Sequence, residues 1–316
     1  MRSLCSFLLA AASLLAGDKD FSGRWNIDVQ NEARSRVWWL EITGAGTKKI
    51  AGRFVGAPGG DMDSIPAPTL DGGELRFTFD RKYRFGAKNR WDTVRPGVYT
   101  ARLRDGKLLG TFSLDGNVVY QWAGHRAPII RDTDDGSWKE GKPLELMNGR
   151  NLDAWTAMVA GQELGWKVAD GITGNVAGAN NLLSKEKFWN FIVKAEYRLG
   201  AKTNGGIGLR GRYEVQILED HGQEQNTHSH GALYSRIQPA MNASKPAGEW
   251  QEVEIRLVGR WVTVKLNGQT TVPKSEIEGL TAIAGNADES SAGPFIVQGD
   301  HGAVEFRRFT VVPLTR

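Results

Sequence analysis

The sequence of 316 residues is nearly free of cysteine. Its one cysteine, Cys5, lies in an apolar stretch that begins after Arg2 and ends in small residues near Gly17. This order is typical of a secretory signal peptide, so we expect residues 1–17 to be removed and the protein to be exported, to the periplasm or the extracellular space. The remaining chain then has no cysteine, which excludes disulfides, thiolate nucleophiles and thiolate metal ligands.

Long hydrophobic runs and clusters of basic residues are also missing. After residue 17, no apolar run approaches the length that crosses a bilayer, so we expect no membrane span. The formal charge is +4, but the 40 Lys and Arg are scattered among 36 Asp and Glu, and no nucleic-acid partner is expected. Gly-x-Ser-x-Gly and Walker patterns are absent too, which argues against the common serine-hydrolase and P-loop nucleotide sites.

Glycine and tryptophan, in contrast, are abundant, with 39 and 11 copies. Between residues 21 and 126, short apolar stretches alternate with turns, as in a meandering antiparallel sheet. The pattern predicts strands at 21–30, 36–43, 48–56, 74–80, 97–104, 107–114 and 118–126. We therefore expect an accessory domain at 18–127, a small antiparallel β-barrel or sandwich of lipocalin-like form.

A second domain is expected after a linker. Residues 128–142 lose the strand pattern and gain charge, glycine and proline, which predicts the linker. Residues 143–316 return to strand patterns, and Asn267 with Gly268 between alternating apolar residues predicts a tight β-hairpin. A stack of antiparallel strands favours a β-sandwich or jelly roll, so the whole protein is predicted to be all-β.

Polar side chains gather at 204–234, which contain three of the five histidines. Read with a period of two, the apolar residues between 207 and 217 fall on one face of a strand pair. The opposite face is predicted to carry Arg210, Arg212, Glu214 and Gln216. Solvated strands also alternate in this way, but a bidentate donor, an ionisable acceptor and an amide side by side are more typical of a site.

Several motifs occur in order along the second domain: LMNGRNLDAW at 146–155, GWKVADG at 165–171, LLSKEKFWNF at 182–191, NGGIGLRGRYEVQILEDHG at 204–222, HGALY at 230–234, PAGEWQEVEI at 246–255, LNG at 266–268 and GPFIVQGDHGAVEFRRF at 293–309. Together, over about 143–314, they resemble the bacterial 3-keto-disaccharide hydrolase domain, a concanavalin A-like jelly roll. Two departures are Gly205, where that family usually has Ser, and 295–297, where Ile-Gly-Leu is typical. Neither departure removes a polar group that we assign to the site.

The resemblance implies a carbohydrate substrate and an enzyme that cleaves the glycosidic bond of 3-keto-glycosides and 3-keto-disaccharides. Oxidation at C3 acidifies the C2 proton, so a base can remove it, the C1 substituent leaves by elimination, and water adds back. The catalytic base is expected to be Glu214 or His230. Arg210 and His301 are expected to stabilise the enolate. The expected substrate-binding residues are Gln216, Tyr234, Gln298 and Arg212.

Two alternatives stay open at this stage. No cofactor is expected, but His221, His228 and His230 lie among acidic residues, so a divalent metal such as calcium is the alternative to a metal-free site. The alternative function is a non-catalytic, lectin-like protein that binds glycans at the cell envelope.

Overall fold

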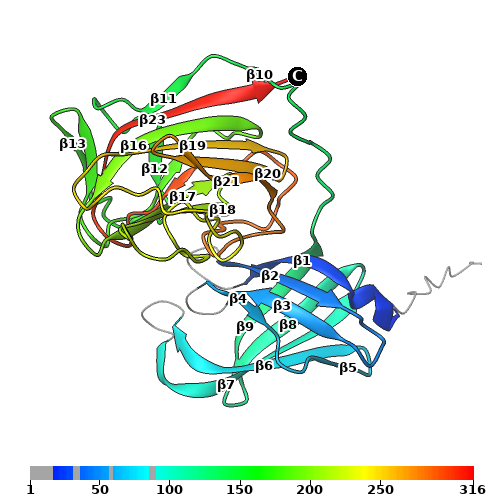
Figure 1. Ribbon diagram of the computed structural model, residues 1–316. Coiled ribbons are helices and arrows are strands. Elements are labelled where there is room, and N and C mark those ends of the chain that lie inside the picture. Colours follow the sequence, from blue (N-terminus) through cyan, green and yellow to red (C-terminus); the bar gives the residue numbers. More distant parts are fainter. Residues whose placement is uncertain (1–16, 31–35, 57–59, 85–89) are drawn as a thin grey trace, which may run out of the picture.

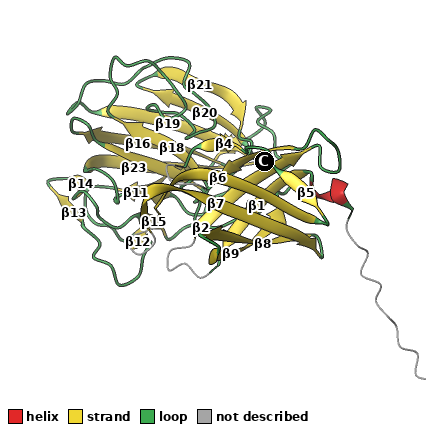
Figure 2. Ribbon diagram, turned by 90° about the horizontal axis from the view of Figure 1, so that it is seen from below, coloured by secondary structure: helices red, strands yellow, loops and turns green. Residues whose placement is uncertain are grey.

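A computed structural model describes residues 17–30, 36–56, 60–84 and 90–316, so the predicted signal peptide lies outside the described residues except for Gly17. The described chain forms two bodies, one above the other in Figure 1, connected by an extended segment. Strands dominate both bodies (Figure 2), and the all-β prediction is confirmed. The helix in the described residues is a short 3-10 turn, η1 (Asp18–Phe21).

The described part of the chain holds no helix with the length and apolar character of a membrane span.

The first body is a single antiparallel sheet that, in the described residues, has nine strands. Its strands are β1 (Gly23–Val29), β2 (Arg36–Thr43), β3 (Ala51–Val55), β4 (Met62–Ser64), β5 (Thr69–Asp71), β6 (Glu74–Arg84), β7 (Arg90–Arg104), β8 (Lys107–Leu114) and β9 (Asn117–Arg126). Chain neighbours pair along the sheet except for β4 and β5, which lie at its two ends, and β1 also pairs with β9, so the order runs from β4 through β1 and β9 to β5. This up-and-down order curls the sheet into the predicted barrel-like form.

Neighbouring residues of β2 face opposite sides of the barrel wall, as strand geometry requires. Trp38 points into the barrel, where its ring centroid lies 5.6 Å from that of Phe54 and 5.5 Å from that of Tyr99. Trp39 points outward and joins the core of the second body together with Val37. One strand therefore closes the barrel interior and also docks the barrel on its neighbour.

The second body consists of two antiparallel sheets around one core. The larger sheet contains β10 (Lys139–Glu140), β11 (Leu144–Met147), β13 (Trp166–Ala169), β14 (Ile172–Asn175), β16 (Phe191–Leu199), β19 (Gln251–Val258), β20 (Trp261–Leu266), β21 (Gln269–Glu276) and β23 (Val304–Thr315). The smaller sheet has the order β12 (Trp155–Ala157), β15 (Leu182–Ser184), β22 (Ile296–Val297), β17 (Asn204–Leu209) and β18 (Tyr213–Leu218). This is the predicted jelly-roll sandwich, called the jelly roll below.

The predicted hairpin at Asn267 and Gly268 joins β20 to β21. Leu266 pairs with Gln269, so the turn has two residues. Both turn residues have positive φ, 50° and 80°, which is the geometry of a primed turn and the reason that Asn-Gly suits it.

The segment predicted as a linker, 128–142, is held against the jelly roll along its length. Asp132 accepts hydrogen bonds of 2.8 Å from the side chains of Trp189 and Asn190. Asp134 pairs with Arg256 at 2.8 Å, and at the end of the segment β10 joins the larger sheet. Composition indicated the change of domain, but it could not show that acidic residues of the segment find partners on the second domain.

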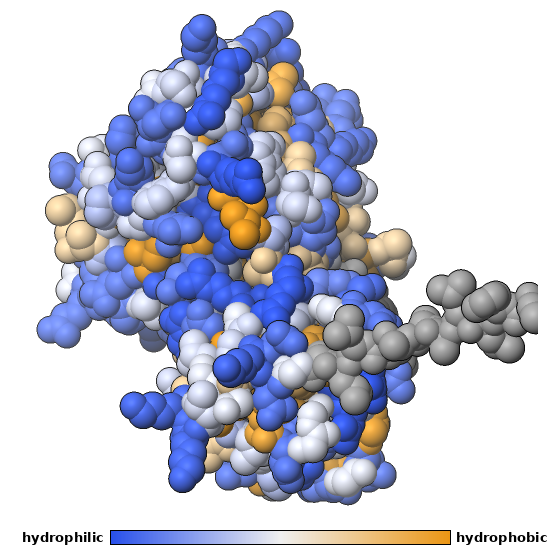
Figure 3. Space-filling view, turned by 90° about the vertical axis from the view of Figure 1, so that its right-hand side faces the viewer, coloured by the Kyte–Doolittle hydropathy of each residue, from blue (hydrophilic) through white to orange (hydrophobic). Residues whose placement is uncertain are grey.

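The barrel and the jelly roll share a buried interface. The guanidinium of Arg236 lies 4.0 Å over the ring of Trp39, which is fully buried. Beside this stack, Asn26 of β1 donates a hydrogen bond of 2.6 Å to the carboxylate of Glu289 in the jelly roll. Figure 3 shows one outer face of the two bodies, which is mostly hydrophilic, with apolar residues in small patches.

Candidate functional site

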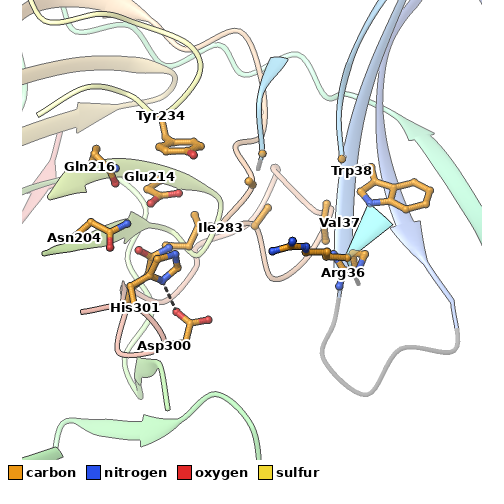
Figure 4. A pocket seen from close by; sticks show the side chains of 16 residues that line it. Arg36, Val37, Trp38, Asn204, Glu214, Gln216, Tyr234, Ile283, Asp300 and His301 are labelled. Atoms are coloured by element: carbon orange, nitrogen blue, oxygen red, sulfur yellow. Dashed lines mark hydrogen bonds and ion pairs between the residues drawn. The ribbon is translucent and has the colours of Figure 1, made fainter. Parts of the chain in front are cut away.

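A cavity of about 400 Å³ lies where the barrel meets the jelly roll. Its lining from the jelly roll is Asn204, Glu214, Gln216, Tyr234, Ala282, Ile283, Ala284, Gln298, Asp300 and His301. Its lining from the barrel is Arg36, Val37, Trp38, Gly56, Gly60 and Arg84. Figure 4 shows the two walls facing each other across the cavity. The volume lies in the range of small-molecule sites, about 300 to 1,000 Å³.

A larger hollow of about 700 Å³ is lined by residues that include Trp166, Arg198 and Glu305. It holds none of the predicted site residues, whereas the cavity at the domain boundary holds five of the eight: Glu214, Gln216, Tyr234, Gln298 and His301. The smaller cavity is therefore the candidate active site.

Strand β18 positions Glu214 and Gln216. The residues between and beside them, Tyr213, Val215 and Ile217, are buried in the sandwich core. Because side chains alternate along a strand, Glu214 and Gln216 point to the opposite face and reach the cavity wall. They are only 4% and 5% exposed, so a ligand would meet them in a largely water-excluded place.

Gly206 of β17 makes room for the carboxyl group of Glu214. A Cβ atom on Gly206 would lie 2.6 Å from Glu214 Oε1 and 2.9 Å from Gln298 Oε1, closer than side chains tolerate. The backbone N–H of Gln298 donates to the carbonyl of Gly206 at 3.0 Å and fixes the segment after β22 beside β17. The carboxyl group of Glu214 and the side-chain amide of Gln298 thus both lie over Gly206.

Tyr234 lies on the same wall and stays protonated at neutral pH. Burial raises the pKa of its hydroxyl to about 12, and the negative charges of Glu214 and Asp61 add to the shift. The ring lies beside His228, with 4.5 Å between centroids. A protonated phenol next to a carboxylate can donate a hydrogen bond or a proton to an oxygen atom bound in the cavity.

His301 and Asp300 form a pair at the cavity edge. Nδ1 of His301 lies 2.9 Å from Oδ1 of Asp300, and Figure 4 shows the two side chains in contact. Asn181 holds the turn below them by accepting from the backbone N–H of Asp300 at 3.1 Å. A carboxylate on Nδ1 orients the imidazole and assigns proton exchange with a ligand to Nε2.

The structure places Arg210 away from the cavity. The hairpin between β17 and β18 turns at Arg210, whose φ is 53°, so the strand alternation predicted through this residue stops there. Its guanidinium stacks 3.9 Å over Trp189 and donates to the carbonyl of Trp189 at 2.5 Å and to Asn190 at 3.1 Å. Burial lowers its pKa to about 10. Arg210 supports the 189–190 segment and is not among the residues that line the cavity.

Arg212 likewise points into a neighbouring loop. Its guanidinium donates to the side chain of Asn286 at 3.1 Å and to the carbonyl of Ser291 at 2.8 Å. The predicted binding role required this side chain on the face of Glu214, and the turn has directed it elsewhere.

His230 is buried behind the cavity wall. Nε2 lies 2.5 Å from the hydroxyl of Tyr197, and the backbone N–H donates to Asp220 at 3.0 Å. Burial lowers the pKa of the imidazole to about 3, so the ring is neutral over the ordinary pH range. His230 is not a lining residue, and of the two predicted bases only Glu214 faces the cavity.

The three clustered histidines of the loop diverge in space. Nδ1 of His221 lies 2.6 Å from the carbonyl of Ser244, and Nε2 of His228 lies 3.0 Å from Asp61 of the barrel. Over the described ranges, no three His, Cys, Asp or Glu residues are arranged to hold a metal ion.

Sequence reasoning missed the barrel wall and Asn204. Arg36 and Arg84 come from the first domain, and no local pattern signals a contact between domains. Asn204 begins β17 inside the polar stretch that the sequence singled out, so its amide next to a glycine-rich strand was a usable signal.

Comparison with known proteins places the jelly roll in a family. Residues 142–312 match the model of the 3-keto-alpha-glucoside-1,2-lyase-like domain. A candidate glycosyl hydrolase of Parabacteroides distasonis ATCC 8503 is 25% identical, with a TM-score of 0.49 over 59% of this chain and 92% of that chain. A second one from the same organism is 19% identical, with a TM-score of 0.47 over 55% and 94%. No curated protein matches the chain.

The family match covers just over half of the chain and contains the whole jelly-roll wall of the cavity, from Asn204 to His301. It excludes the barrel. The chain is therefore a member of the 3-keto-alpha-glucoside-1,2-lyase-like family, a glycoside-acting enzyme with a further β-barrel at its N-terminal side.

Proposed function

We propose that the protein cleaves the glycosidic bond of 3-keto-glycosides and 3-keto-disaccharides by elimination followed by hydration. The observation that carries this proposal is the setting of Glu214, a buried carboxyl group in the cavity wall with proton and hydrogen-bond donors around it. Asp300, the second acid among the described lining residues, is engaged with His301. One base surrounded by donors suits proton abstraction next to a ketone.

In the proposed reaction, the carboxylate of Glu214 takes the proton from C2, and the electron pair forms the C2–C3 double bond of an enolate with its charge on the C3 oxygen. Return of that pair restores the C3 ketone, forms the C1–C2 double bond and breaks the bond from C1 to the leaving oxygen, which takes up a proton. Water then adds to C1 and a proton returns to C2. The sum is hydrolysis without a covalent enzyme intermediate.

The other lining residues stabilise the enolate, protonate the leaving group and bind the sugar hydroxyls. His301, oriented by Asp300, donates to the C3 oxygen as its negative charge develops. Tyr234, protonated beside Glu214, supplies the proton to the leaving oxygen. The amides of Gln216 and Gln298 hold hydroxyl groups of the sugar. The assignment replaces the predicted Arg210 and His230 by groups that border the cavity.

Two further observations support the proposal. The name of the family describes a 1,2-lyase of 3-keto-alpha-glucosides, and elimination across C1 and C2 is lyase chemistry. The lining of ionisable groups also favours an enzyme over a lectin-like protein, because sugar-binding modules favour exposed aromatic platforms and neutral amides. The apolar stretch at 1–17 supports export as the setting of this activity.

The test is to run the reaction in deuterated water on a 3-keto-glucoside and on the unoxidised glucoside. We expect release of the leaving group from the 3-keto form only, with deuterium at C2 of the product sugar. Release without deuterium at C2 would exclude elimination in favour of direct displacement at C1. Binding of both sugars without release from either would establish the lectin-like alternative.

A further inference from the structure

The barrel supplies one wall of the cavity, although it lies outside the region that matches the family. Arg36 at the start of β2 and Arg84 at the end of β6 line this wall. In Figure 4 the side chain of Arg36 extends from the barrel toward the side that carries His301 and Ile283. A ligand that fills the cavity therefore meets both domains.

The position of Arg36 is well defined by its surroundings. Its backbone pairs with Val29 in the register of β1 and β2. Three residues further along the same strand, Trp39 is buried in the interface under Arg236. The strand that carries Arg36 is thus anchored in the barrel sheet and in the interface.

The two walls differ in hydrogen-bonding chemistry. The jelly-roll wall mixes acceptors, such as Glu214 and Asp300, with amides and a phenol that donate, and this mixture suits sugar hydroxyls, which do both. Among the described residues, the polar side chains that the barrel contributes to the lining are two arginines, which only donate and carry positive charge. Such a wall matches a group that only accepts and carries negative charge.

The ion pair that Arg84 forms does not remove this difference. Arg84 has Asp92 at 3.5 Å, but the two side chains are 54% and 64% exposed, so water screens the pair strongly. The acids on the opposite wall, Glu214 and Asp300, have their own assignments in the proposed reaction. A negatively charged group bound between the walls would be drawn to the barrel side.

We infer that the barrel forms the leaving-group side of the active site and that Arg36, with Arg84, binds an anionic group, a carboxylate or a sulfate, on the leaving group. The inference rests on the proposed function, because it takes the 3-keto ring to lie at Glu214. The substrate class is then an acidic 3-keto-glycoside, in which the second unit carries the charge. Arg36 is a specificity residue in this scheme and takes no part in the bond changes.

The experiment compares 3-keto-glucosides of three phenols: 4-carbamoylphenyl, 4-carboxyphenyl and 4-sulfophenyl. The amide and the carboxylate have nearly the same shape, so they differ chiefly in charge. We expect a higher kcat/KM for the anionic substrates, and Arg36→Gln should lower it roughly tenfold to hundredfold, mainly through KM. The same variant should change kcat/KM for the amide by less than about threefold. The sulfonate distinguishes a general anion site from a carboxylate site.

A matched control is Arg102→Gln, which removes an exposed arginine of the barrel that pairs with Glu74 and does not line the cavity. It should leave the preference for anionic substrates intact. Equal kcat/KM for amide and carboxylate in the wild type, or an equal loss for both in Arg36→Gln, would overturn the inference.

Binding of the three unoxidised glucosides, measured by calorimetry, separates this inference from the proposed reaction. Tighter binding of the anions that Arg36→Gln abolishes supports the anion site even if no 3-keto substrate is cleaved, in which case the proposed function fails alone. Cleavage of the amide substrate with no anion preference in binding or turnover refutes the anion site and retains the proposed function.

Discussion

At the scale of single residues, Glu214 is the group on which the proposed reaction depends. Glu214→Gln keeps the shape of the side chain and removes the ionisable acceptor, so kcat/KM on a 3-keto-glycoside should fall on the order of a hundredfold to ten-thousandfold. Glu219→Gln is the control, since Glu219 follows β18 and caps the backbone N–H of Lys202 without lining the cavity. Normal turnover by folded Glu214→Gln protein would remove Glu214 from the mechanism.

The burial of His230 predicts how the stability of the folded protein depends on pH. In the folded protein, burial lowers the pKa of the His230 imidazole to about 3, whereas a histidine in an unfolded chain has a pKa of about 6.5. Between these values the unfolded chain binds a proton that the folded protein does not, so the stability present at neutral pH is lost as the pH falls below about 6.5. The slope is at most about 1.4 kcal/mol per pH unit.

His230→Gln should flatten this dependence, and urea unfolding between pH 7 and pH 5 measures it. The variant removes the titrating group and keeps a polar side chain near Tyr197. Parallel curves for the wild type and the variant would mean that His230 does not contribute to the acid sensitivity.

At the scale of elements, the β17–β18 hairpin shows how far sequence reasoning reaches. The alternation from Tyr213 to Ile217 lies within one regular strand, so its core face and its site face could both be predicted. The directions of the Arg210 and Arg212 side chains could not be predicted in this way. The chain turns at Arg210 and Gly211, both with positive φ, and a turn ends the period of two. The glycine in Arg-Gly-Arg was the available signal of that turn.

Gly206 in β17 gives a test of how this hairpin shapes the site. Its backbone is not in the left-handed region, so alanine can adopt the strand conformation, but the new Cβ would meet Glu214 Oε1 at 2.6 Å. Gly206→Ala should therefore displace the base and lower activity by roughly a hundredfold, with a smaller effect on the melting temperature.

Gly174→Ala is the matched control for this substitution. Gly174 also lies in a strand, β14, and a Cβ there would meet Glu305 at 3.5 Å, an ordinary contact. Similar activity losses for the two alanine variants would contradict the account of Gly206 as the space for the carboxyl group.

At the scale of the whole molecule, the cavity exists because two domains are docked. The sequence allowed each fold to be predicted, since strand patterns and turns are local, but the docking depends on outward residues such as Trp39, which periodicity treats like any other strand residue. The barrel half of the cavity, with Arg36, therefore lay beyond sequence reasoning. The same docking joins the stability of the two domains to the integrity of the site.

Glu289 is the polar centre of this docking and gives the last prediction. Its carboxylate is fully buried and accepts from Asn26 of the barrel at 2.6 Å, from the hydroxyl of Tyr213 at 2.6 Å and from Arg260 at 2.9 Å. Glu289→Ala would leave the buried guanidinium of Arg260 without its counter-ion. Removing one partner of a buried ion pair leaves the other charge buried without a counter-ion to compensate for its lost hydration. We therefore expect a loss of about 3–5 kcal/mol in the free energy of unfolding.

The control is Glu305→Ala, which also removes the acid of an ion pair, but of one that lies at the surface, with Arg198. It should lower the free energy of unfolding by no more than about 1 kcal/mol. Urea unfolding followed by tryptophan fluorescence measures both. Since Asn26 loses its carboxylate partner as well, the barrel of Glu289→Ala should separate from the jelly roll at a lower urea concentration than in the wild type, and activity should disappear in that first transition. Loss of activity only with the unfolding of the jelly roll would show that the site works without the barrel wall.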